Sequence, residues 1–241
     1  MHSAITQSYF TIPGTKPTAP PCAFHTEFNA LDDLAPSGAF QGGAVHELLC
    51  HPRSLSPKSF ALLLAKAAQK QGGVIVWSDP RRELHPPALS AAGIDLRHLI
   101  LLRCPKRSDE LWALTECLRC RGVSATVAAI QHLSRIEARR LQLAAERGGG
   151  VGLFLRPFTQ ATNAHYAAAT RWLVQPAPAD SGIQRWSVEL LHGHGLRRVQ
   201  SSRGQVGQVV LLEVDRETRA VRASAPLADR SAAPPPARAT A

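Results

Sequence analysis

Short hydrophobic runs alternate with amphipathic segments through the middle of the chain. The runs are rich in Val, Ile and Leu, as in strands buried on both faces of a sheet, whereas the segments between them repeat apolar residues at helical spacing. The predicted strands cover residues 42–49, 73–79, 97–104, 123–130 and 151–157. Helices are predicted within residues 57–71, 80–94, 108–122 and 133–150. This alternation predicts right-handed βαβ units and an α/β fold with a mostly parallel sheet flanked by helices.

The pattern changes after residue 157. Three strand-like runs with short connections follow, at 171–178, 185–195 and 206–215, and they predict an antiparallel C-terminal extension of the same sheet.

Three regions are expected along the chain. Residues 1–37 have weak periodicity and predict a loosely ordered arm with a short helix near Glu27–Leu34. Residues 38–222 form the main domain. Residues 223–241 are rich in Pro and Ala and lack the large apolar residues that could offset the entropy of ordering, so we expect a disordered tail.

Local signals place the ends and faces of two helices. Ser56 can cap the helix of residues 57–71, and Pro57 fits its first turn, where a missing N–H costs nothing. In the last predicted helix, the apolar side chains are expected to face the sheet and two arginines to face water. The apolar residues are Leu133, Ile136 and Leu141, and the arginines are Arg135 and Arg139.

Composition narrows the class of protein. With 241 residues, 44% of them hydrophobic, the chain can bury one substantial core. Its apolar runs are too short to span a membrane, and its first residues lack the pattern of a secretory signal, so we expect a soluble, cytoplasmic protein. The 28 Lys and Arg against 18 Asp and Glu give a net charge of +10, which favours polyanions such as nucleic acid without naming a partner.

The five cysteines are scattered and odd in number, which predicts reduced thiols. Cys117 and Cys120 form a CxxC pair, but no second pair stands near them and their surroundings predict a helix. We therefore interpret them as packing thiols and expect no metal site.

The segment from Glu47 to Asp79 has the order of a phosphate-binding loop: strand, loop, Lys58, Ser59, helix. Both glycine positions of that motif are prolines, Pro52 and Pro57, which lack the N–H donors and the backbone freedom that a phosphate cradle needs. No carboxylate for magnesium ends the later strand of residues 123–130. Lys58 and Ser59 are therefore vestigial cofactor-binding positions, and no cofactor and no ATP hydrolysis are expected. Anion binding at the helix N-terminus stays open.

A set of segments, taken in order, resembles the ImuA family of RecA-like proteins. These segments are GGAVHELL, the defective loop at Lys58 and Ser59, AAGIDLRHLILLR, RRLQLAAERGGGVGLFLRP, RWLV and RWSVELLHGHG. The resemblance covers residues 38–215 and implies a RecA-like fold. An older grouping places such proteins with the SulA division inhibitors.

The resemblance implies a non-catalytic accessory subunit of the translesion synthesis machinery, or mutasome, induced in the SOS response to DNA damage. Its implied partners are an ImuB-like relative of the Y-family polymerases and an error-prone C-family DNA polymerase. RecA and direct DNA contact stay open as further partners, and no membrane is involved. The alternative is a SulA-like inhibitor that binds the tubulin-like division protein.

We further hypothesise a partner-binding surface on the C-terminal strands and tail, because Trp and Arg are enriched at the centres of interfaces. The alternative places both tryptophans in the core. The residues of this surface are Trp172, Trp186, Arg197, Arg198 and Arg203.

Overall fold

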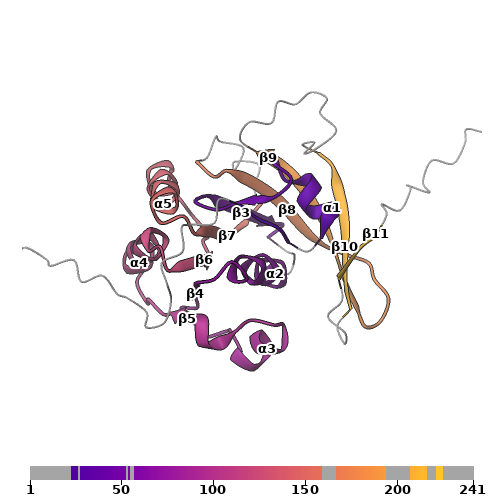
Figure 1. Cartoon of the computed structure of the whole chain (residues 1–241), viewed down its shortest axis with the longest axis horizontal. Helices are drawn as coiled ribbons and strands as arrows, with labels where there is room; N and C mark the ends of the chain where they lie inside the picture. Colours follow the sequence, from indigo (N-terminus) through magenta and orange to yellow (C-terminus); the bar gives the residue numbers. More distant parts are fainter. Residues whose placement is uncertain are drawn as a thin grey trace, which may run out of the picture.

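The computed structural model describes residues 23–26, 28–52, 54, 57–158, 167–193, 207–215 and 221–224. Among these residues, nine strands form one central sheet (Figure 1). In spatial order the strands are β11 (Val221–Ser224), β10 (Val209–Asp215), β9 (Ile183–Gly193), β8 (Thr170–Ala177), β3 (Val45–Cys50), β7 (Val151–Pro157), β6 (Val123–Ala129), β4 (Val74–Ser78) and β5 (Leu99–Leu102). The strands from β8 to β5 are parallel, and the pairs from β8 to β11 are antiparallel.

Helices cover both faces of the parallel part of the sheet. On one face, α2 (Lys58–Gln69) and α3 (Pro86–Ala91) pack on a large apolar core, and the 3-10 helix Leu96–His98 follows α3. On the other face, α4 (Arg107–Arg119) and α5 (Arg135–Gly148) lie side by side over a second core (Figure 1). This is the α/β architecture that the alternating pattern predicts.

The direction of β8 differs from the prediction. The three C-terminal runs were all expected to be antiparallel, but β8 pairs with β3 in parallel, with His46 opposite Thr170 and Leu49 opposite Leu173. The antiparallel extension begins only at β9. The hydrophobic pattern of a strand marks which residues are buried and carries no information on its direction.

Residues 23–37, which the sequence analysis assigns to a loosely ordered arm, pack on the main domain where the structure describes them. The expected short helix is α1 (Asn29–Leu34), and β1 (Ala23–Phe24) pairs with β2 (Phe40–Gln41). Phe24, Leu31 and Leu34 are buried, and the Phe24 ring stacks on Phe40. A few large apolar side chains are enough to hold this segment because the main domain offers an apolar surface to bury them.

The Asp32 carboxylate stabilises the start of this segment through hydrogen bonds with Thr26. It accepts hydrogen bonds from the backbone N–H of Thr26, at 3.0 Å, and from the Thr26 hydroxyl, at 2.8 Å. At the other end of the chain, residues 223 and 224 of the predicted tail end β11, and the remainder of the tail lies outside the described residues.

The α5 helix has strong signals at both ends. Ser134 accepts the backbone N–H of Glu137 while the Glu137 side chain accepts the backbone N–H of Ser134, and Gly149 ends the helix at φ +84°. Leu141 faces the core as predicted, but Ile136 is 75% exposed. Leu133 lies before the N-cap of α5, so its position does not follow the periodicity of the helix. The spacing from Leu133 to Ile136 therefore wrongly predicted that Ile136 faces the sheet.

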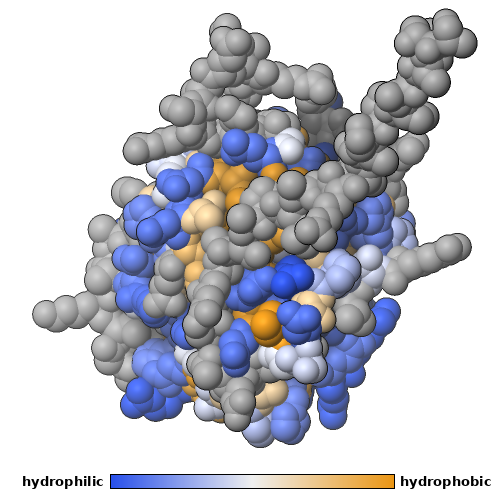
Figure 2. Space-filling model, turned by 90° about the vertical axis from the view of Figure 1, so that its right-hand side faces the viewer, coloured by the Kyte–Doolittle hydropathy of each residue, from blue (hydrophilic) through white to orange (hydrophobic). Residues whose placement is uncertain are grey.

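The side of the molecule with the antiparallel strands carries exposed apolar residues. Figure 2 shows hydrophobic residues in the middle of this face and hydrophilic residues around them. No helix among the described residues is long and apolar enough to cross a membrane.

Candidate functional site at the carboxyl edge of the sheet

The strand and helix of the phosphate-loop pattern are present as β3 and α2, and the structure describes residues 51, 52, 54 and 57 of the loop between them. Pro57 is the N-cap of α2, with φ −75° and ψ 37°, rather than a residue of its first turn. It provides no side-chain cap, and Ser56 lies outside the described residues. The start of α2 thus has a proline where a phosphate loop has a glycine whose N–H can point at an anion.

Lys58 is held by a carboxylate from the next strand connection. Its ammonium group lies 2.5 Å from Glu83, which follows β4, and both side chains are partly exposed. The hydrogen bond and the charge of Lys58 lower the pKa of Glu83. Ser59 is exposed to solvent. A phosphate at this position would have to displace an anionic group already bound to Lys58.

Polar residues at the end of β4 hold neighbouring segments of the chain. The Asp79 carboxylate accepts the backbone N–H of Glu83 at 2.8 Å and lies 3.9 Å from the Arg103 guanidinium. The Ser78 hydroxyl donates to the Glu110 carboxylate at the start of α4. α/β proteins usually bind ligands at this edge of the sheet. Here its polar side chains already bind other residues of the same chain.

A buried ion cluster connects β3 to the strands on both sides of it. Glu47, 1% exposed, accepts hydrogen bonds from Arg156 of β7 at 2.5 Å and from Arg171 of β8 at 2.9 Å. The hydrophobic pattern of the sequence did not predict this cluster. In the sequence, each of the three residues is a charged residue inside or beside an otherwise apolar strand. A charged residue is buried only with a partner, so this pattern could have indicated the cluster.

A chain of hydrogen bonds crosses the other face of the same strands. The Trp172 indole N–H donates to the Thr170 hydroxyl, whose oxygen lies 2.6 Å from His46 Nδ1, and His46 Nε2 lies 3.0 Å from the Gln41 carbonyl. All donors are satisfied if the Thr170 hydroxyl donates to Nδ1 and the imidazole donates through Nε2. Burial lowers the pKa of His46 to about 4, so the imidazole is neutral at pH 7. His46 is thereby a structural residue of this network.

The two tryptophans of the hypothesised partner surface lie in the core. Trp172 is 0% exposed and stacks on Phe40, and Trp186 is buried in a T-shaped contact with Phe60. This corrects their assignment to a partner surface and agrees with the alternative, because a buried indole offers no surface to another protein. The arginines of the same hypothesis, Arg197, Arg198 and Arg203, lie outside the described residues.

The cysteines of the CxxC pair lie at the C-terminal end of α4. Cys117 is in the helix and Cys120 is its C-cap. Burial raises the pKa of the Cys117 thiol to about 11, which disfavours the thiolate that binds metals. Within the described part of the chain, no group of three or more His, Cys, Asp or Glu residues could hold a metal ion.

The parallel sheet, its flanking helices and the strand–loop–helix at Lys58 define the chain as a RecA-like α/β protein. It is similar to the crystal structure of the RadB recombinase, with a TM-score of 0.58 and 14% identity, over 80% of this chain and 96% of that one. This similarity concerns the fold alone and confirms the predicted RecA-like class.

The family follows from a comparison with curated proteins. The chain is 30% identical over 204 residues to Protein ImuA of two strains of Caulobacter vibrioides, which covers 76% of this chain and 83% of each relative. The chain belongs to the ImuA family, which confirms the resemblance drawn from its motifs. No family model matches it.

Proposed function

We propose that this chain is a non-catalytic accessory subunit of translesion DNA synthesis, acting by binding other proteins in DNA damage tolerance and mutagenesis. Membership in the ImuA family carries this proposal. The proposed partners are an ImuB-like polymerase relative and an error-prone C-family DNA polymerase, with RecA and DNA as further candidates. The comparisons give no support to the alternative of a SulA-like division inhibitor.

The carboxyl edge of the sheet supports a binding role without ATP turnover. Pro52 and Pro57 remove two N–H donors from the loop, and Glu83 neutralises Lys58. The described end of β6 carries Ala128 and Ala129, and no carboxylate stands there for magnesium. Phosphoryl transfer depends on placed positive charge around the phosphates, and these residues supply little of it.

The first experiment is size-exclusion chromatography with light scattering on the purified chain, mixed with the ImuB-like protein of the same organism at moderate salt. We expect a stoichiometric complex. A catalytically active Y-family polymerase from the same organism is the control and should elute separately. Two well-folded proteins that elute independently at micromolar concentration would contradict the proposal.

ATP turnover is the second test. The purified chain with magnesium and ATP is expected to release no phosphate above the protein-free blank, and Lys58→Ala should leave that result unchanged. A RecA protein assayed in parallel shows that the conditions support hydrolysis. Turnover that is present in the natural chain and abolished in Lys58→Ala would show that the loop is active.

A further inference from the structure

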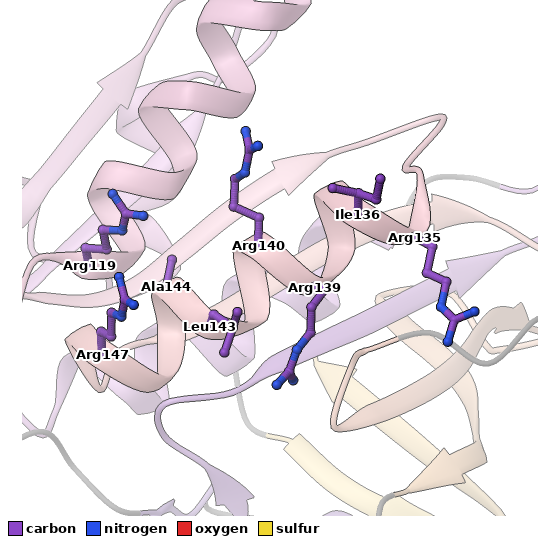
Figure 3. A pocket seen from close by; sticks show the side chains of 8 residues that line it. All are labelled: Arg119, Arg135, Ile136, Arg139, Arg140, Leu143, Ala144 and Arg147. Atoms are coloured by element: carbon purple, nitrogen blue, oxygen red, sulfur yellow. The ribbon is translucent and has the colours of Figure 1, made fainter.

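A groove of about 480 Å³ lies on the outer surface of α5 and the C-terminal end of α4, away from the phosphate-loop edge. Its lining contains five arginines together with Ile136, Leu143 and Ala144, and it contains no acidic residue (Figure 3). The arginines are Arg119, Arg135, Arg139, Arg140 and Arg147.

The centre of the groove is aliphatic and exposed. Ile136 is 75% exposed and Leu143 is 37% exposed, because Ala138, Leu141 and Ala145 form the buried face of α5. A single exposed isoleucine is common on protein surfaces. Here Ile136 and Leu143 lie two helical turns apart on the same outer face of α5. Apolar residues at this spacing can contact the apolar face of a partner helix.

Arginines flank this stripe on both sides. Figure 3 shows Arg140, Arg119 and Arg147 projecting toward one side of α5 and Arg135 and Arg139 toward the other.

Within the described part of the chain, only two of these arginines lie near a carboxylate. Arg119 pairs with Glu116 at 2.7 Å, and Arg139 lies 3.9 Å from Glu146. The remaining three arginines of the groove form no ion pair among the residues that the structure describes. Guanidinium groups at such positions are available for bidentate contacts with carboxylates or phosphates.

We propose that this groove docks an acidic amphipathic helix of a partner protein. Residues 136–147 span roughly 16 Å at 1.5 Å per residue, which matches about three turns of a helix laid along α5. Such a helix would place its apolar residues on Ile136 and Leu143 and its carboxylates against the arginines on both sides. The inference goes beyond the proposed function, since it assigns a surface and the chemistry of its partner.

The lining favours a peptide over nucleic acid. Single strands are bound through cations together with aromatic side chains on which bases stack, and duplexes through cations along the phosphates. The groove has no aromatic residue, and its centre is aliphatic rather than polar. An apolar stripe between two rows of arginines instead complements an apolar stripe between two rows of carboxylates.

The test is fluorescence anisotropy with a labelled, designed 18-residue helical peptide that carries a Leu stripe flanked by Glu, titrated with the full chain. Two control peptides replace the Glu residues by Lys or the Leu residues by Ser, and labelled single- and double-stranded oligonucleotides complete the set. We expect the acidic peptide to bind more tightly than every other probe, and its affinity to fall with salt.

Two variants locate the binding. Arg140→Glu with Arg147→Glu is expected to raise the dissociation constant of the acidic peptide by about tenfold or more, since charge-assisted contacts are replaced by repulsion. Ile136→Ser should weaken it by about threefold to tenfold through lost apolar contact. The matched control is Arg81→Glu with Arg97→Glu, which makes the same charge change at exposed arginines outside the groove. All of these positions are exposed, and thermal unfolding confirms that each variant is folded.

Two results would overturn the proposal. In the first, the groove variants and the control variant bind the acidic peptide alike. In the second, an oligonucleotide binds more tightly than the acidic peptide and loses affinity in the Arg140 and Arg147 variant, which would assign the groove to nucleic acid. Because the probe is a designed peptide, neither result bears on whether the chain forms the mutasome complex.

Discussion

Replacing Glu47 by glutamine is expected to lower the free energy of unfolding by about 3–5 kcal/mol, since it leaves two buried guanidinium groups without their shared carboxylate. Glutamine has nearly the same volume as glutamate, so the loss reports charge rather than packing. Urea unfolding followed by circular dichroism measures it.

The matched control is Glu83→Gln, which removes the same charge from the exposed pair with Lys58. Solvent screens that pair, so its loss should be much smaller. If Glu47→Gln costs no more than Glu83→Gln, the buried cluster does not stabilise the fold in the way that its geometry indicates.

Trp172→Ala is expected to cost about 3–5 kcal/mol of unfolding free energy, because it empties a fully buried site and removes the N–H that the Thr170 hydroxyl accepts. The same urea unfolding experiment measures the loss. A domain of this size is typically stable by only about 5–15 kcal/mol, so the variant is expected to be only marginally folded.

Trp112→Ala is the control for Trp172. Trp112 is 69% exposed on α4, and its removal should change stability little. Equal stabilities of the two variants would contradict the core position of Trp172. If Trp172→Ala also loses a partner, the loss has to be compared with the folded fraction before it is attributed to an interface.

Strand β8 explains why these two changes should be the largest. Its neighbouring residues Arg171 and Trp172 point to opposite faces of the sheet, one to the ion cluster and the other to the hydrogen-bond chain through His46. Both interactions reach β3, with which β8 pairs in parallel. Polar contacts on both faces of the sheet therefore join β8 to the central strand β3.

Much of the candidate site could be predicted from local sequence. Pro52 and Pro57 stand at the glycine positions of the loop, and a proline lacks its N–H in any fold. The partner of Lys58 could not be predicted in this way, because Glu83 lies 25 residues away and meets it only after β4 has paired in the sheet. For the same reason, the pairing of Glu47 with Arg156 and Arg171 could not be predicted. The sequence shows them only as charged residues in or beside apolar runs.

The sequence by itself determined the class of the protein: the alternation of buried strands and amphipathic helices, the loss of the phosphate-loop glycines and the motifs of the ImuA family. These features are local, since the spacing of apolar residues predicts whether a strand is buried on both faces or a helix on one face. Only the tertiary structure decided the direction of β8 and the burial of Trp172 and Trp186. Each of these depends on which distant segment packs against the strand or side chain. The spacing of apolar positions does not show which segment that is.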